Sequence, residues 1–232
     1  SETAQCLYCR AEIDHRVING QINKPQKKKD GEWYVKWALK QWNTNLERYL
    51  KGEISLNELL NSPARPRLLV KVKAINRDLE FEPAAEQDNE KLWKALEKLR
   101  AIWGDPDIPI EELWKYTASG GGALSIWTWG FDKFYKLFNP RQLLTLVKLV
   151  KLIREVGKKI EEEKLREGWS KEDAFKYAEA VTTYLAIALV RFVDHNNIAT
   201  LLHPSNPMGI EIAHALSMRG IAMQWNWGDT NP

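Results

Sequence analysis

Residues 129–144, with the sequence WGFDKFYKLFNPRQLL, indicate how this chain folds more clearly than any other stretch. They begin with aromatic and basic residues and then reach Asn139 and Pro140, which are favoured at the N-cap and the first position of a helix. Apolar residues follow at the spacing of one helix face: Leu143, Leu144, Val147, Val150, Ile153 and Ile160. The pattern predicts a long helix that ends at Glu167 and Gly168.

A second long helix is predicted directly after the first. Ser170, with Asp173 three residues later, is typical of a capped helix start. The apolar face that follows consists of Ala174, Tyr177, Ala178, Val181, Leu185, Ala188, Leu189 and Phe192. We expect His195 and Asn196 to cap the C-terminal end of this helix. Because the link between the two helices is short, they should form an antiparallel hairpin.

The residues before this hairpin mix helical and strand patterns. Helices are predicted at residues 88–103 and 109–116, with short helical pieces at 43–50 and 55–60. In the last of these, Ser55 and Glu58 fit a capping box. Strands are predicted at 33–37, at 69–75, and on both sides of Asn19 and Gly20, a pair typical of a tight hairpin turn.

These patterns predict an α+β fold that is mainly α. A small β-containing part at residues 1–85 should precede a helical domain at residues 86–232, in which the long antiparallel helix pair forms the C-terminal half. The chain is long enough for one large domain or two small ones.

The amino-acid composition limits the classes of protein to which this chain can belong. The 232 residues carry a net charge of +3, with 44% hydrophobic and 28% charged residues, which is typical of a soluble globular protein. No apolar run is long enough to cross a bilayer and the first residues lack a secretory signal, so we expect a cytoplasmic protein without membrane contact. Most of the eleven tryptophans should serve packing, because the indole ring buries a large area.

Cys6 and Cys9 have the spacing of one knuckle of a zinc ribbon, in which two thiolates from a tight turn bind one metal ion. A complete site needs four ligands and the chain has no other cysteine, so we expect the second pair of cysteines to lie upstream. The N-terminal part should then be zinc-ribbon-like. The alternative is a pair of ordinary or redox-active thiols, although no βαβ pattern follows, as thioredoxin-like chemistry would need.

A candidate DNA-binding site surrounds the predicted helix start at Asn139. It consists of Lys133, Lys136, Arg141 and Gln142. The first turn of a helix offers free N–H groups and a positive dipole to a phosphate, and lysine or arginine adds charge. The alternative interpretation is that the neighbouring aromatic residues belong to the core and that the charges are only solvated.

Two stretches resemble the adenine-specific DNA methylases that carry a zinc ribbon. That family has a run of the form WGF…W…LFNPRQLL, which residues 129–144 match. It also has a closing stretch like RQALPMVWDFAEVNP, which Met223, Trp225, Asn231 and Pro232 match by position. The resemblance covers residues 125–232 well and extends to Cys6 and Cys9. Asn226 replaces an acidic residue of the family, and Gly228 and Asp229 replace Ala-Glu.

The resemblance implies a parent enzyme that methylates N6 of adenine in DNA with S-adenosylmethionine. The chain contains neither the glycine-rich cofactor loop nor the Asp/Asn-Pro-Pro-Tyr/Phe catalytic tetrapeptide of such enzymes. We therefore expect an internal structural or DNA-contacting segment that lacks the catalytic motifs. The cofactor site would lie outside it, and its partners would be DNA and the remaining methyltransferase domain. The alternative is a free-standing helical interaction or nucleic-acid-binding module with no enzymatic activity.

Overall fold

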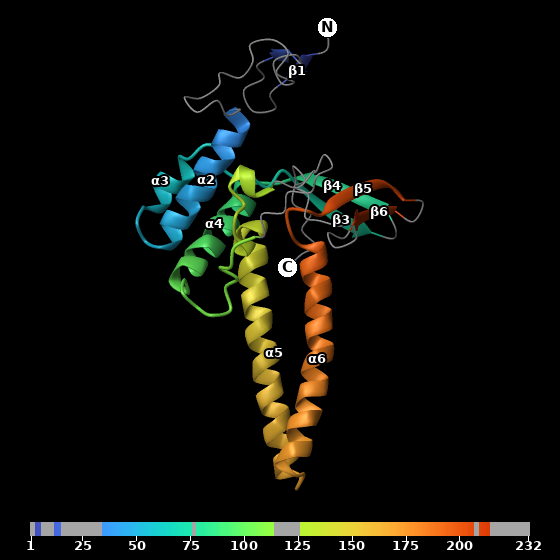
Figure 1. Ribbon diagram of the computed structural model, residues 1–232. Coiled ribbons are helices and arrows are strands. Elements are labelled where there is room, and N and C mark those ends of the chain that lie inside the picture. Colours follow the sequence, from blue (N-terminus) through green and yellow to red (C-terminus); the bar gives the residue numbers. More distant parts are fainter. Residues whose placement is uncertain are drawn as a thin grey trace, which may run out of the picture.

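Two long antiparallel helices, α5 (Pro140–Arg166) and α6 (Lys171–His195), dominate the computed structural model. They project from a head formed by the other elements (Figure 1). The structure describes residues 3–5, 12–14, 34–75, 78–113, 126–206 and 209–213, with side chains at 36–73, 80–113 and 126–200. The predictions of a mainly helical protein and of a long helix pair are confirmed.

Helix α5 begins where the sequence places it, because Asn139 and Gln142 cap its N-terminus reciprocally. Asn139 Oδ1 accepts hydrogen bonds from the backbone N–H groups of Arg141 (3.0 Å) and Gln142 (2.9 Å). In return, Gln142 Oε1 accepts one from the Asn139 backbone N–H at 2.9 Å. Pro140 occupies the first helical turn, where its missing N–H costs nothing.

The link between α5 and α6 is closed by a left-handed glycine and a serine cap. Gly168 has a φ of +90°, a conformation that glycine adopts without a steric penalty. Ser170 Oγ accepts a hydrogen bond from the Asp173 N–H at 3.1 Å, as expected from the sequence. Next to this turn, the rings of Trp169 and Tyr177 pack edge to face at 5.6 Å. The tip of the hairpin is therefore a fixed turn.

The C-terminal end of α6 is capped by asparagine side chains. Asn196 Nδ2 donates to the Phe192 carbonyl (2.9 Å) and Asn197 Nδ2 to the Val193 carbonyl (2.6 Å). The prediction of capping by Asn196 is confirmed, and Asn197 is a second capping residue that the sequence pattern did not single out. The helix ends at His195 as expected.

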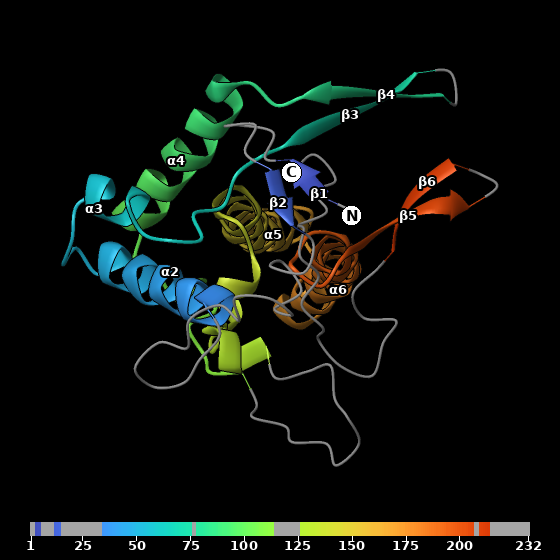
Figure 2. The same cartoon turned by 90° about the horizontal axis from the view of Figure 1, so that it is seen from above.

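The head contains helices α2 (Tyr34–Leu50), α3 (Leu56–Leu60) and α4 (Glu86–Ala101). Figure 2 shows α2 and α4 beside the upper end of α5. The expected strand at residues 33–37 is wrong, because these residues lead into α2. Three aromatic residues in a short window favoured a strand, but Ala38, Trp42 and Tyr49 are buried at helical spacing.

The short helix expected at residues 109–116 is also wrong in its described part. Residues 109–113 run antiparallel to residues 132–135 and form backbone hydrogen bonds with them. The Leu113 N–H donates to the Asp132 carbonyl (2.8 Å), and the Tyr135 N–H donates to the Pro109 carbonyl (2.9 Å). The backbone N–H and C=O groups of this segment find hydrogen-bond partners in residues 132–135, so they do not need the partners that a local helix would supply.

The strands form three antiparallel hairpins in the described part of the chain: β1 (Thr3–Gln5) with β2 (Glu12–Asp14), β3 (Val70–Ile75) with β4 (Asp78–Pro83), and β5 (Leu201–Asn206) with β6 (Gly209–Ala213). Strand β3 confirms the expectation for residues 69–75. The capping box of Ser55 and Glu58 at α3 is confirmed too. The hairpin turn expected at Asn19 and Gly20 lies outside the described residues.

The main apolar core lies where the head meets the upper end of α5. It combines side chains from α2, α3, α4 and α5 with Tyr135 and two loop residues, Ile54 and Ile108. The full set is Trp42, Tyr49, Leu50, Ile54, Leu59, Leu96, Leu99, Ile108, Tyr135, Leu143 and Val147. These residues come from both sides of the domain boundary expected at residue 85. The upper end of α5 is therefore part of the head, and the rest of the hairpin extends from it (Figure 1).

Gly157 lies at a close contact between α5 and α6. A Cβ atom at this position would lie 2.8 Å from Thr182 Cγ2, which is closer than carbon atoms pack in proteins. We expect Gly157→Ala to lower the free energy of unfolding by about 1 kcal/mol, because this overlap outweighs the better helix propensity of alanine. In a Thr182→Ser background, which lacks Cγ2, the same change should be neutral or stabilising. Urea unfolding of the four proteins measures both effects, and equal effects in the two backgrounds would contradict this contact.

Candidate functional site

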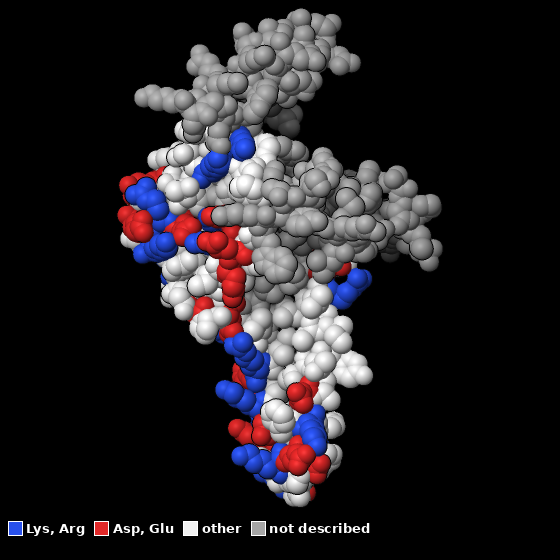
Figure 3. Space-filling view, in the orientation of Figure 1, with Lys and Arg blue, Asp and Glu red and all other residues white. Residues whose placement is uncertain are grey.

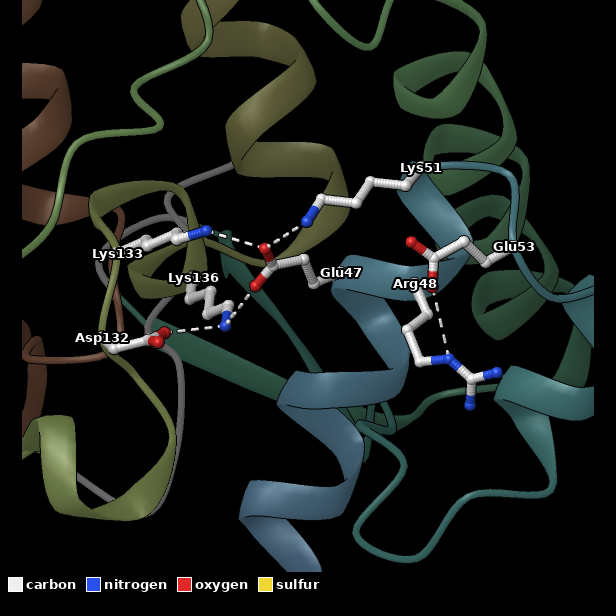
Figure 4. Close-up of polar contacts among 7 residues, drawn as sticks. All are labelled: Glu47, Arg48, Lys51, Glu53, Asp132, Lys133 and Lys136. Atoms are coloured by element: carbon white, nitrogen blue, oxygen red, sulfur yellow. Dashed lines mark hydrogen bonds and ion pairs between the residues drawn. The ribbon is translucent and has the colours of Figure 1, made fainter.

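The predicted DNA-binding lysines lie in the segment that joins the pairing at residues 132–135 to the start of α5. A 3-10 turn at Phe134–Leu137 follows the extended residues and directs the chain toward Asn139. Figure 4 shows that the side chains of Lys133 and Lys136 point toward α2 and meet Glu47 there. The site that the structure builds is therefore an internal charge cluster between α2 and this segment.

Glu47 is the centre of that cluster. Its Oε1 lies 2.7 Å from Lys133 Nζ and 2.9 Å from Lys51 Nζ, and its Oε2 lies 3.2 Å from Lys136 Nζ. Asp132 adds a second carboxylate at 2.7 Å from Lys136 Nζ. We call these five residues, Glu47, Lys51, Asp132, Lys133 and Lys136, the Glu47 cluster. Two carboxylates thus face three lysines from two segments far apart in the sequence.

The centre of the cluster, Glu47 and Lys136, is largely removed from solvent, whereas Lys51 and Asp132 at its edge are about half exposed. The side chain of Lys136 is only 3% exposed and that of Glu47 is 19% exposed. A buried charge is costly unless it is paired, so each of these groups depends on its partners. By contrast, Arg48 and Glu53, which also form an ion pair beside the cluster (Figure 4), are half exposed. Such an exposed pair contributes little to stability.

The contacts with the three lysines lower the pKa of Glu47. Burial alone would raise it, but the hydrogen bonds from Lys133 and Lys51 and the charge of Lys136 outweigh burial and lower the pKa to about 2. The neighbouring Tyr135 is 1% exposed, and burial together with the charge of Glu47 raises the pKa of its phenol far above the usual value. The Tyr135 hydroxyl has no hydrogen-bond partner among the described residues.

This arrangement acts as a clamp between two segments. The Lys136 amine is directed at two carboxylates, and its buried side chain leaves no route for a phosphate to reach it. The Lys133 amine likewise donates a hydrogen bond to Glu47. We expected both lysines to face DNA. In the structure they instead hold the start of α5 against α2.

Gln142 and Arg141 complete the set of predicted DNA-binding residues. Gln142 is 0% exposed, and its side chain serves the cap of α5. Arg141 is partly buried in the first turn of the helix, where Asn139 already accepts its backbone N–H. Two of the N–H donors that would attract a phosphate are thus occupied. DNA contact at this site stays a prediction, and Arg141 is the residue left to test it.

The alternative interpretation of this segment fits the structure in its first half. Phe131, Tyr135 and Leu137 are buried core residues, as that interpretation expected. The charges, however, are paired internally rather than solvated. Sequence reasoning missed Glu47 because it lies 86 residues before Lys133, and no local spacing links the two.

Lys148, Lys151 and Arg154 form a basic stripe on α5, continued by Lys158, that by its spacing could follow a nucleic acid backbone. Two of these residues are engaged with acids of the head. Lys151 pairs with Asp105 and Arg154 with Asp107, both in the loop that follows α4. The hydrogen bond from Lys151 lowers the pKa of Asp105, and the Asp107 N–H that Asp105 also accepts adds to this effect. The stripe that could have followed a nucleic acid backbone is therefore partly used to brace α5.

Several expectations concern residues that the structure does not describe. Cys6 and Cys9, the predicted zinc ligands, lie between β1 and β2 and outside the described residues, as does the closing stretch at 214–232. Within the described ranges, no group of three or more His, Cys, Asp or Glu side chains is arranged to hold a metal ion. No helix in that part of the chain is both long and apolar enough to cross a membrane.

Comparison of the chain with protein-family models, with curated proteins and with solved structures finds no match.

The Glu47 cluster predicts a specific loss of stability in acid. Since the pKa of Glu47 falls from 4.5 to about 2 on folding, its contribution is fully present above pH 4.5 and is lost as the pH falls toward 2. At about 1.4 kcal/mol for each pKa unit, the contribution amounts to roughly 3 kcal/mol. We expect Glu47→Gln to lower the free energy of unfolding at pH 7 by about 2–3 kcal/mol and to flatten its pH dependence between 4.5 and 2.

Glu53→Gln is the matched control for this prediction. Glu53 is an acid six residues further along that pairs with Arg48 at 3.5 Å on the surface. Its removal should lower the free energy of unfolding by less than about 1 kcal/mol. The fall in that free energy between pH 4.5 and pH 2 should stay as in the wild type. Guanidinium unfolding at a series of pH values compares the two variants. If the pH dependence of the free energy of unfolding between pH 4.5 and pH 2 is flattened equally in both variants, or in neither, Glu47 is not the central anion.

Proposed function

We propose that this chain is a non-catalytic structural module of an S-adenosylmethionine-dependent enzyme that methylates N6 of adenine in DNA, and that it holds a helical arm at a fixed angle. The parent activity is inferred from the resemblance of residues 129–144 and of the closing stretch to the zinc-ribbon-containing methylases. In this proposal, S-adenosylmethionine and the catalytic tetrapeptide belong to the remaining methyltransferase domain.

One observation carries the structural part of the proposal: the motif that resembles the methylases is the joint between head and arm. Phe131, Tyr135 and Leu137 are buried in the head, and Asn139 and Gln142 cap the first turn of the arm. The lysines of the motif are held by Glu47 on α2. These groups of the motif thus set the direction of α5. This supports a scaffold rather than a reactive site.

Zinc at Cys6 and Cys9 belongs to the same proposal. Two thiolates at this spacing would supply half of a structural site, and the remaining ligands would come from the parent protein. Such a site would fasten the N-terminal part of the module and would take no part in methyl transfer.

The alternative function, a free-standing helical interaction module, is favoured by a different observation. Large apolar side chains remain exposed along the hairpin, among them Tyr184 at 76% and Ile187 at 57%. Exposed apolar surface of this kind marks contact with another protein. The two functions differ in whether the gene that encodes this chain also encodes the cofactor loop and the catalytic tetrapeptide.

The first test of the proposal is methyl transfer. The chain alone should transfer no labelled methyl group from S-adenosylmethionine to adenine in duplex DNA, because no residue of it supplies the tetrapeptide that binds a flipped adenine. The longer gene product that contains the chain should transfer it, and removal of residues 155–184, which lie beyond the core of the head, should reduce the rate. Transfer by the chain alone would contradict a purely structural role, and an inactive gene product without the two motifs would favour the free-standing module.

The second test concerns DNA contact by Arg141. If Arg141 faces a phosphate, Arg141→Ala in the longer gene product should weaken DNA binding and reduce the slope of log affinity against log salt by about 0.9, the value for one phosphate. Arg154→Ala is the control, since Arg154 lies on the same helix and pairs with Asp107. Fluorescence anisotropy at several salt concentrations measures both slopes. An unchanged slope together with a lower unfolding temperature would show that Arg141 is structural.

A further inference from the structure

The β3–β4 hairpin is a two-stranded ribbon with one apolar face and one charged face. In its register, Val70 lies opposite Pro83 and Val72 lies opposite Phe81. Opposite residues, and residues two apart on one strand, point to the same side of an antiparallel pair, so these four side chains share one face. We call the four residues the ribbon face. All of them are exposed, with Val70 at 54%, Val72 at 46% and Phe81 at 56%.

The other face of the ribbon already has its partners. Lys71 and Lys73 lie on it, opposite Glu82 and Glu80. The Nζ atom of Lys73 lies 2.6 Å from a carboxylate oxygen of Glu82, and that of Lys71 lies 3.0 Å from a carboxylate oxygen of Asp88 in the first turn of α4. The contact with Asp88 ties the charged face to α4, which leaves the ribbon face on the opposite side.

A two-stranded ribbon needs more than its own hydrogen bonds to be stable in water. Isolated hairpins are marginally stable at best, and an apolar face has to pack against another element. Figure 3 shows that charged side chains cover the surface over α3 and over the tip of the α5–α6 hairpin. The ribbon face consists of two valines, a phenylalanine and a proline, without any charge. Its partner should therefore be an apolar and uncharged segment.

Residues 221–227, with the sequence IAMQWNW, have the matching pattern. Ile221, Met223, Trp225 and Trp227 are large and apolar, and alanine, glutamine and asparagine separate them. An alternation of this kind places the four apolar side chains on one side of an extended chain. The stretch carries no charge, and no other stretch outside the described residues has four large apolar residues at alternate positions.

The segment also begins close to the ribbon along the chain. Strand β6 ends at Ala213 and lies beside β4 (Figures 1 and 2). Residues 214–220 can span up to roughly 23 Å when extended, which exceeds the length of about 20 Å for the six residues of β4. Residues 221–227 can therefore reach the ribbon face.

We propose that the apolar side of residues 221–227 packs against the ribbon face and covers it. In this arrangement Met223 and Trp225 contact Val72 and Phe81, and the polar side chains between the apolar ones point to solvent. The ribbon then has one face held by α4 and the other held by this segment. The inference goes beyond the proposed function and does not depend on it, because it rests on the register of the ribbon and on the apolar pattern alone.

Oxidation of Met223 by hydrogen peroxide, followed by mass spectrometry, tests whether the segment is covered. In the full chain, Met223 should be oxidised at least roughly tenfold more slowly than in a free peptide of residues 219–230. Phe81→Asp places a charge on the ribbon face and should bring the rate close to that of the peptide. Glu80→Gln, the control on the charged face, should leave the rate unchanged. A wild-type rate equal to that of the peptide, or an unchanged rate in Phe81→Asp, overturns the proposal.

Cross-linking identifies the contact and the copy of the chain that makes it. In a chain with Cys6→Ser and Cys9→Ser, a bismaleimide that spans about 10 Å, the separation of packed β-layers, should join Val72→Cys to Trp225→Cys within one chain. Lys73→Cys, on the charged face, should not be joined to Trp225→Cys. Links between two chains in place of links within one assign the ribbon face to a second copy and overturn the proposal. Equal linking of Val72→Cys and Lys73→Cys overturns it as well, and so does the absence of any link, which leaves another protein as the occupant.

Discussion

The segment that leads into the arm is organised around a single carboxylate. Glu47 lies on α2, and its two oxygens hold lysines that belong to the segment leading into α5. Without this anion, Lys136 would be a buried cation facing Asp132 alone. A buried ion pair adds little net stability over an apolar contact of the same shape, but its geometry is specific, and a displaced partner is penalised heavily. The cluster therefore fixes the register of two segments more than it strengthens their contact.

The same constraint explains why the motif looks functional in the sequence. Aromatic residues, lysines and a helix start in one stretch are what a phosphate site requires, and they are also what a buried joint requires. The aromatic side chains fill the core, and a lysine among them must find a carboxylate. An acid in another helix, Glu47, decides between a phosphate site and a buried joint. The sequence of the stretch alone does not distinguish the two.

Much of the fold could be predicted because its signals are local. The caps at Asn139, Ser55 and Ser170 depend on side chains within three residues, and the helix pair depends on regular apolar spacing. Two local predictions were wrong, at residues 33–37 and at residues 109–113. Burial of one face of α2 decided the structure at the first, and pairing with residues 132–135 decided it at the second. In the candidate site, the helix start was predictable and Glu47 was not, because ion pairs between distant segments leave no periodic pattern.

The length of α5 has a mechanical consequence. At a rise of about 1.5 Å per residue, its 27 residues make a lever of roughly 40 Å, which the head contacts from its first turn as far as Arg154. A rotation of about 5° at the Glu47 cluster would move the tip near Gly168 by roughly 3–4 Å, from the same geometry. A change in charge or packing at the root is thus amplified into a displacement at the far end, which makes the joint a natural place for any signal that must travel along the arm.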